Sequence, residues 1–424
     1  MLWRLAAPNV IAVVIMSVVT FADAFFVGKL GTAPLASLAL VYPFQTLMIM
    51  MAGGAIGGAA TSSVARALGS GSIEKAEAAA WHAVIIAGLM SLIFVLALGM
   101  FARHIFSLLG GTGEALDGAV LYSGIAFGGS VSIFVLWILA AILRGTGDTA
   151  TPARVIIIGS AAQIALSGAL TLGWGVFPSI GIAGPATSMV VCQSCMAIYL
   201  AMYLINGKTI IRLRAQSIQR APLADIMKVG GVGLINSVTV AATVIVVTGV
   251  VGHFGTEALA GYGLGSRLEL MLIPIIFGIG AALTAAVGAN IGAGQHARAR
   301  RIAWTGAGVS FFVIGVVGIV VAIFPNLWLG WFTTDPAAYS YGSLYLGIVA
   351  PFYGLFGAGQ ALYFASQGTG RMVLPVSVGV ARFLVVSIIG FVAISFTWSL
   401  TIVFAGVSVG LITIGLGLSL CLLG

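Results

Sequence analysis

The chain has 424 residues, of which 60% are hydrophobic and only 7% are charged, whereas soluble domains carry roughly 25% charged residues. A water-soluble fold is therefore excluded, because so few charges cannot cover its surface. The net charge of +8 is scattered over short polar segments, so it indicates orientation in a membrane and not nucleic-acid binding. Long apolar runs without alternation exclude a transmembrane β-barrel.

In chain order, breaks at clusters of charge, Gly and Pro predict an all-α membrane protein with twelve spans. No cleavable signal is expected, because the first apolar segment is too long and lacks a small-residue cleavage site. The expected spans cover residues 6–28, 34–62, 79–102, 117–142, 153–173, 184–205, 228–251, 260–289, 302–324, 339–365, 373–396 and 399–423.

The distribution of basic residues predicts the orientation of these spans. Most of the 18 Lys and Arg fall in alternate loops, so the positive-inside rule predicts a multi-pass protein of the cell membrane with both termini in the cytoplasm. The longest polar stretch, residues 207–227, is expected to be a cytoplasmic linker at the lipid surface. It separates an N-terminal six-helix lobe, residues 1–206, from a C-terminal six-helix lobe, residues 228–424. We interpret the basic residues of the linker as a topological anchor, with a basic regulatory patch as the alternative.

The two halves repeat each other at an offset of about 223 residues. Because each half has an even number of spans, the halves share one orientation and are related by an axis along the membrane normal. This plan favours a transporter with a cavity between two bundles over a channel. The matching positions are the VG-x-x-GT-x-x-LA pattern at 27–36 and 251–260, then Gly69, Gly71 and Trp81 with Gly292, Gly294 and Trp304, and the Gly-Thr-Gly of 145–147 with that of 368–370.

Four charged residues fall inside the expected spans: Asp23, Arg267, Glu269 and Arg382. A charge at membrane depth costs at least about 2.5 kcal/mol, so each is a functional candidate. Asp23 is the strongest, because no basic residue adjoins it in sequence and desolvation favours uptake of a proton. The alternative is a carboxylate that neighbouring hydroxyls cap for structure alone.

Arg267 and Glu269 are two residues apart on one helix and cannot face each other. Their partners are expected on other spans of the C-terminal half, and Arg382 is the expected mate of Glu269. A buried structural ion network is favoured over a second coupling site.

Three motifs carry a family resemblance: Ala22-Asp23 with the segment 26–32, Leu143 to Thr149 with Pro152, and Arg267-Leu268-Glu269. They resemble the multidrug and toxic compound extrusion (MATE) family, whose superfamily also contains lipid and polysaccharide flippases. The chain is more similar to the DNA-damage-inducible-F-like (DinF-like) branch than to the NorM branch, because spans 228–251 and 339–365 contain no carboxylate.

The resemblance implies the MATE fold, with two six-helix lobes related by pseudo-twofold symmetry and forming a V. It also implies a secondary multidrug efflux antiporter working by alternating access. Such a protein exports organic, often cationic compounds in exchange for H⁺ or Na⁺.

The resemblance also implies a coupling site. In archaeal and DinF-like members, the aspartate of span one is joined by an asparagine and an aspartate of span five and a threonine of span six. The matching positions here are Gln163, Ser167 and Thr187, so Asp23 is the sole carboxylate. We therefore favour H⁺ over Na⁺, which would need a shell of neutral oxygens. Gln163 and Ser167 share one helix face, and ordinary hydrogen bonding between helices is the alternative role.

Pro8 either begins the first helix as its N1 residue or breaks a backbone bond within it. Relatives carry a proline at the matching place, where the helix can bend, so Pro8 is a hinge candidate, with N1 the simpler interpretation. The loop from Arg144 to Pro152 lacks the ending of a P-loop and follows a helix, so ATP binding is not expected. Arg144 and Asp148 are expected to pair and help to close the cytoplasmic gate.

The remaining reactive residues indicate no chemistry of their own. The four His have no metal-ligand spacing, no Ser/His/Asp grouping is present, and Cys192 and Cys195 are interpreted as plain helix positions. We expect a monomeric transporter and not an enzyme, with no metal, no cofactor besides the coupling ion, and small organic substrates and membrane lipid as its partners. A lipid or lipid-linked oligosaccharide flippase is the alternative, although Arg267 and Arg382 alone would supply its cavity with cations.

Overall fold

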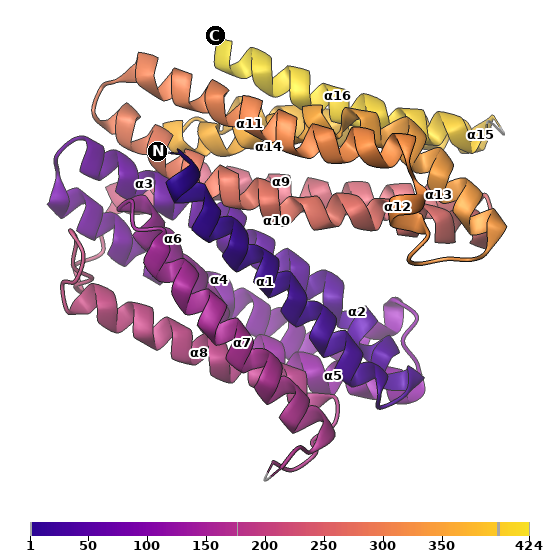
Figure 1. Cartoon of the computed structure of the whole chain (residues 1–424). Coiled ribbons are helices and arrows are strands. Elements are labelled where there is room, and N and C mark those ends of the chain that lie inside the picture. Colours follow the sequence, from indigo (N-terminus) through magenta and orange to yellow (C-terminus); the bar gives the residue numbers. More distant parts are fainter. Residues whose placement is uncertain (1, 176, 397–398, 424) are drawn as a thin grey trace.

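The computed structural model of the protein describes residues 2–175, 177–396 and 399–423. Over this part of the chain, long helices form two bundles that meet at one end and diverge toward the other (Figure 1). Both ends of the chain lie at the end where the bundles meet.

The first bundle holds the helices before the polar linker. Two of its spans are interrupted: a π-helical segment separates α2 from α3, and α5 and α6 meet at a bend of 45°. The elements are α1 (Leu2–Gly28), α2 (Thr32–Ile49), η1 (Met50–Ile56), α3 (Gly57–Gly69), α4 (Ile73–Leu108), α5 (Gly113–Gly128), α6 (Ser130–Gly145), α7 (Ala150–Leu172) and α8 (Ala183–Ile205).

The second bundle follows the linker and repeats this plan. A short 3-10 segment joins α13 to α14, so that the pair forms one interrupted span. The elements are α9 (Arg220–Gly252), α10 (Thr256–Gly292), α11 (His296–Ile323), α12 (Asn326–Leu329), α13 (Pro336–Val349), η2 (Ala350–Phe352), α14 (Tyr353–Thr369), α15 (Val373–Ser395) and α16 (Leu400–Leu423).

Eleven helical segments of the described chain are long and apolar enough to cross a membrane, or twelve when the bent pair of α5 and α6 counts as one span. The predicted all-α fold is therefore confirmed, and each of the twelve expected spans coincides with one of these segments.

Two helix ends differ from the expectation. The helix α9 begins at Arg220, so the polar segment between the bundles is limited to residues 206–219. Pro222 lies in the first turn of α9, where its missing N–H has no helical partner to lose. Pro8 lies inside α1 and not at its N1 position, because the helix already begins at Leu2. The N1 interpretation of Pro8 is therefore wrong.

The internal repeat is visible in matching hydrogen bonds. Thr61 Oγ1 donates to the Ala141 carbonyl at 2.9 Å, and Thr284 Oγ1 donates to the Phe364 carbonyl at 2.8 Å. Each residue of the second pair stands 223 positions after its counterpart in the first pair. In both bundles, the helix that ends an interrupted span is thus fixed to its neighbour by the same contact.

The bundles approach each other closely where α3 meets α10. Gly69 lies against the carbonyl of Ala289, and Gly292 lies against the carbonyl of Arg66. These two contacts exchange places under the repeat, so they lie about its pseudo-twofold axis. A Cβ at either glycine would collide with the facing backbone, so only glycine permits this approach.

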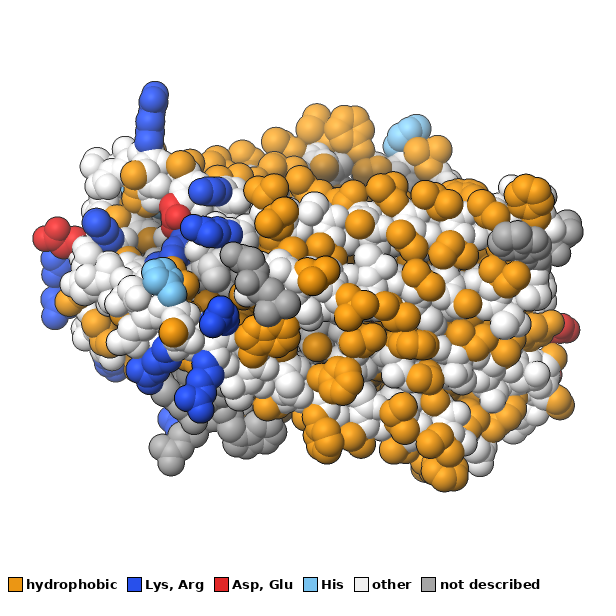
Figure 2. Space-filling model, turned by 90° about the horizontal axis from the view of Figure 1, so that it is seen from above, with side chains coloured by type: hydrophobic (Ala, Val, Ile, Leu, Met, Phe, Trp, Pro, Cys, Tyr) orange, Lys and Arg blue, Asp and Glu red, His pale blue; other side chains and the backbone are white. Residues whose placement is uncertain are grey.

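The molecular surface divides into a charged end and an apolar body. Figure 2 shows Lys and Arg gathered at one end, with hydrophobic side chains over the remaining length of the face in view. We call this end the basic end; it is formed by the loops that follow α3, α6, α8, α10 and α14. The opposite end is called the far end. The crossing of α3 and α10 lies at the basic end.

Candidate functional site

Asp23 lies on α1 within the first bundle, where α1 packs against α7. The residue is 8% exposed, and Ser167 Oγ of α7 donates a hydrogen bond to Asp23 Oδ1. None of the ion pairs among the described residues includes Asp23. The site is thus a buried carboxyl group with a hydroxyl partner and without a cation.

Two aromatic rings pack beside the neighbours of this pair. Phe26, one turn after Asp23, meets Trp174 edge to face with ring centroids 5.5 Å apart. A Cβ at Gly168, beside Ser167, would lie 2.6 Å from the Trp174 ring, so glycine is needed for the ring to settle there. Because Asp23 itself is buried, an uncompensated charge on it is costly.

Two uncharged polar residues buried or partly buried in the same bundle were not predicted from the sequence. Tyr122 of α5 is buried. Gln45 of α2 donates through Nε2 to Tyr122 Oη at 3.0 Å and to Met189 Sδ of α8 at 3.4 Å. Both are polar residues within apolar spans, 34–62 and 117–142, and this feature of the sequence could have identified them as candidates.

The other two predicted partners of Asp23 lie on α7 and α8 but are not hydrogen-bonded to it. Gln163 is buried on α7 one turn before Ser167, and Thr187 is partly buried near the start of α8. Among the described residues, no hydrogen bond joins either side chain to Asp23. The structure therefore brings only Ser167 into direct contact with the carboxyl group.

A second carboxyl group lies in the other bundle, on α10. Glu269 Oε1 is 3.8 Å from Arg382 Nη2 of α15, and Tyr345 Oη of α13 donates to Glu269 Oε2 at 3.2 Å. The guanidinium group of Arg382 also lies over the ring of Phe356, 5.5 Å from its centroid. The expected contact between Glu269 and Arg382 is thus present, and the charge of this carboxylate is compensated.

Aromatic side chains enclose the second site as well. Tyr345 packs edge to face against Tyr262 and Phe404, with ring centroids 5.4 and 5.1 Å away. Arg267, by contrast, is exposed, and no ion pair within the described part of the chain includes it. It is separate from the network that Glu269 and Arg382 form.

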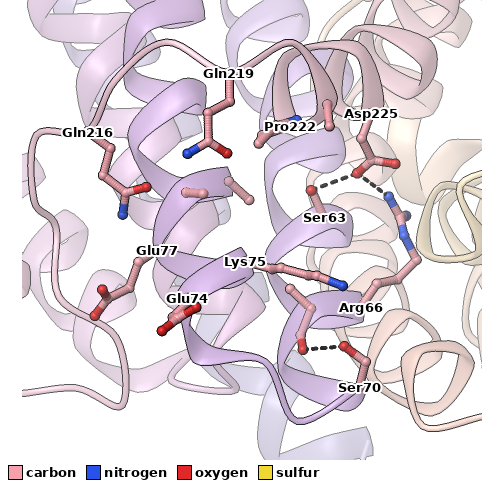
Figure 3. A pocket seen from close by; sticks show the side chains of 14 residues that line it. Ser63, Arg66, Ser70, Glu74, Lys75, Glu77, Gln216, Gln219, Pro222 and Asp225 are labelled. Atoms are coloured by element: carbon pink, nitrogen blue, oxygen red, sulfur yellow. Dashed lines mark hydrogen bonds and ion pairs between the residues drawn. The ribbon is translucent and has the colours of Figure 1, made fainter.

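The two bundles are held together at the basic end by a cluster around Arg66 of α3. Arg66 Nη2 is 2.7 Å from Asp225 Oδ2 in the first turns of α9, and Ser63 Oγ donates to the same oxygen at 2.7 Å (Figure 3). Arg66 Nη1 reaches the Gly368 carbonyl of α14 at 3.4 Å, and Ser62 donates to the carbonyl of Gln367. We define the inter-bundle latch as the contacts of Arg66 with Asp225 and Gly368, together with the contact of Ser63 with Asp225.

The latch borders a pocket of about 710 Å³ between α3, α4 and the beginning of α9 (Figure 3). Its polar lining includes Lys75, Glu74 and Glu77. Because the pocket opens beside the latch, polar groups of the latch remain within reach of water.

The expected gate pair of Arg144 and Asp148 is not formed. Asp148 Oδ1 instead accepts a hydrogen bond from the backbone N–H of Thr151 at 3.0 Å, in the first turn of α7. Arg144 is buried in the last turn of α6, and no ion pair of the described residues involves either side chain. An aspartate just before a helix is well placed to bind a free N–H, which explains why it turns away from Arg144.

Three comparisons with known proteins agree with this architecture. The family model MatE matches residues 8–167 and 234–392, one block in each bundle. A "FAD transporter" of Shewanella oneidensis is 26% identical over 366 residues, which cover 84% of this chain and 79% of the relative. The "Probable multidrug resistance protein YoeA" of Bacillus subtilis is 24% identical and covers 88% of this chain and 82% of its own.

Among solved structures, a MOP superfamily transporter from Pyrococcus furiosus has a TM-score of 0.92 at 21% identity. The match covers 99% of this chain and 94% of that one, so the fold is shared along the whole length. Because the family model matches well over half of the sequence, the resemblance read from the motifs is confirmed, whereas the DinF-like branch stays a prediction. The chain belongs to the MatE family: it is a MATE transporter.

Proposed function

We propose that the protein is a secondary active multidrug efflux antiporter in which Asp23 carries the coupling proton. The observation that carries this proposal is the environment of Asp23: buried, hydrogen-bonded by Ser167 and without a cation in any ion pair of the described residues. An uncompensated carboxylate is costly there, so the group binds a proton or a cation whenever it is closed off from water. The exported compounds are organic and often cationic.

The contacts of Asp23 support H⁺ over Na⁺ as the coupling ion. A Na⁺ ion would need several oxygen ligands, yet the hydrogen bond that reaches Asp23 comes from one hydroxyl group, that of Ser167. Gln163 and Thr187 would both have to turn toward Asp23 to complete a shell of oxygens. A proton needs only the carboxyl group itself.

The arrangement of the bundles supports alternating access. The hydrogen bonds and ion pair of the latch join the bundles at the basic end, whereas the bundles diverge toward the far end in Figure 1. By the positive-inside rule, we assign the basic end and both termini to the cytoplasm. The described state is then closed inward. A proton that enters from outside would neutralise Asp23 and favour release of the drug, and its loss to the cytoplasm would reset the cycle.

We assign Glu269 and Arg382 a structural role in this cycle. Their mutual compensation leaves neither group in need of a proton, and aromatic packing around Tyr345 holds the carboxylate in place. A flippase for anionic lipid-linked substrates is the alternative. It has less support, because Arg382 already faces Glu269, and Arg267 is exposed and outside this network.

Efflux from everted membrane vesicles tests the proposal. A fluorescent organic cation should accumulate when only a pH gradient is applied, and should not accumulate when only a Na⁺ gradient is applied. Vesicles that carry Asp23→Asn should fail under both conditions. Transport driven by Na⁺ alone would overturn the proton assignment, and transport by the Asn variant at the normal rate would overturn the role of Asp23.

A further inference from the structure

The linker between the bundles is fixed to the first bundle at three points. We call residues 206–219 the strap. The Trp81 indole N–H donates to the Gln216 carbonyl at 2.9 Å, and the backbone N–H of Gln219 donates to His82 Nε2 at 2.8 Å. The backbone N–H of Arg212 donates to Glu77 Oε1 at 2.8 Å. These three partners all belong to α4, so the strap presents a defined surface, although it is not helical.

The strap has an inner and an outer face. Ile211 is fully buried and Leu213 packs against the core. Ile210 and Ile218, in contrast, are 64% and 74% exposed. Three basic residues close to these isoleucines in the sequence also have exposed side chains: Lys208, Arg212 and Arg214. The outer face therefore combines isolated apolar side chains with three cations.

The strap lies at the boundary of the apolar body. It follows directly after α8, whose last turns expose Tyr199, Met202 and Ile205. An outward row of large apolar side chains at a helix end is typical of contact with lipid, and the basic residues begin where this row stops. The outer face of the strap is thus at the depth of lipid headgroups.

We propose that the outer face of the strap is a docking surface for anionic phospholipid headgroups of the leaflet at the basic end. Lys208, Arg212 and Arg214 would bind phosphate groups through charge-assisted hydrogen bonds, and Ile210 and Ile218 would enter the layer just below them. The inference goes beyond the transport function and does not depend on it, because it concerns only lipid contact.

A second basic cluster of the same size provides a contrast. Arg298, Arg300 and Arg301 are exposed in the first turns of α11, also at the basic end. No large exposed hydrophobic residue lies among them; the next one along α11 is Val309. If charge alone attracted anionic lipid, the two clusters would bind it equally. If apolar insertion and a fixed surface matter, the strap binds it more tightly.

The experiment compares lipid retention by the purified full-length protein and two triple variants. Native mass spectrometry with added phosphatidylglycerol or phosphatidylcholine measures the affinity for each lipid. The first variant is Lys208→Gln/Arg212→Gln/Arg214→Gln, and its matched control is Arg298→Gln/Arg300→Gln/Arg301→Gln. All six side chains are exposed, so both variants should fold, and gel filtration checks this. We expect the strap variant to lose on the order of tenfold in affinity for phosphatidylglycerol, and the α11 variant less than twofold.

A third variant, Ile210→Ser/Ile218→Ser, isolates the apolar contribution and should lose affinity severalfold. An excess of soluble glycerol phosphate should not displace the bound lipid, because it has no acyl chains to place below the isoleucines. Equal losses in the two triple variants, unchanged binding by the strap variant, or displacement by glycerol phosphate would each overturn the proposal.

Discussion

The carboxyl groups of the two bundles have similar surroundings, but only one of them is paired with a cationic side chain. Asp23 and Glu269 each lie within a membrane bundle, accept a hydrogen bond from a hydroxyl group and stand beside aromatic rings. Only Glu269 faces a guanidinium group, that of Arg382. The difference teaches that burial alone does not make a coupling site. A carboxylate that already has its cation has no need of a proton, whereas one that lacks a cation does.

Replacement of Asp23 by Asn should have the largest effect. The amide keeps the shape of the side chain and its contact with Ser167 but cannot exchange a proton, so we expect proton-driven efflux to fall to background. Drug efflux from cells and vesicles measures this. The matched control is Asp117→Asn, which removes an exposed carboxylate paired with Arg103 on the surface and should leave efflux unchanged. Equal loss in both variants would show that the effect is not specific to Asp23.

A cation placed beside Asp23 should make this site resemble that of Glu269. Gln163→Lys puts an ammonium group one helical turn from Ser167, on the same face of α7. We expect efflux to fall at least tenfold while the protein stays folded, because the compensated carboxylate no longer needs a proton. The companion variant Gln163→Met controls for loss of the amide and should keep most of the activity. Full activity of the Lys variant would contradict our explanation of the difference between the two sites.

Removal of the cation from the second site should reduce stability. In Arg382→Met, the Glu269 carboxylate is left buried without its partner, at a cost of about 3 kcal/mol. The midpoint of thermal unfolding in detergent should therefore fall. Adding Glu269→Gln to this variant should recover most of the loss, because the unpaired charge is then gone. A double variant as unstable as Arg382→Met would mean that packing of the Arg382 stem against Phe356 dominates.

The smallest effects are expected from the two hydroxyl groups. Ser167→Ala and Tyr345→Phe each remove one hydrogen bond to a carboxyl group, worth about 1.5 to 3 kcal/mol if that group is charged. We expect Ser167→Ala to slow efflux severalfold and Tyr345→Phe to lower only the unfolding temperature. Initial efflux rates and melting curves of the two variants distinguish these outcomes. A slower efflux in Tyr345→Phe alone would reverse the roles assigned to the two bundles.

The spans and the repeat could be predicted from the sequence because both depend on local pattern. Twenty apolar residues between polar breaks indicate a span wherever it packs, and the recurrence of Gly69 at Gly292 is visible without a structure. The pairing of Glu269 with Arg382 was predicted by elimination, since so few charges fall within spans. The π-helical segment between α2 and α3 was not predicted, because an extra residue per turn leaves no periodic signal in seven residues.

The latch could not be predicted, for a physical reason. Arg66 and Asp225 are 159 positions apart, and each was assigned to a polar segment at the basic end, where charges are expected to be solvated. Arg66 meets Asp225 only because α9 packs against the π-helical segment and α3 in the folded protein. The sequence also placed Arg144 and Asp148 four residues apart, an attractive spacing, but the turn between α6 and α7 directs the aspartate to the next helix instead.

The glycine contacts of the α3 and α10 crossing have a mechanical consequence. Gly69 and Gly292 touch carbonyl groups of the facing helix, so this part of the seal between the bundles, unlike the latch, consists of dispersion and weak C–H contacts. Such attraction falls by a quarter to a half when surfaces separate by about 0.5 to 1 Å. Once a small gap opens, these contacts weaken, whereas the ion pair between Arg66 and Asp225 still attracts the bundles across the gap. The glycine contacts should therefore resist the first small separation of the helices, and the latch should oppose a wider one.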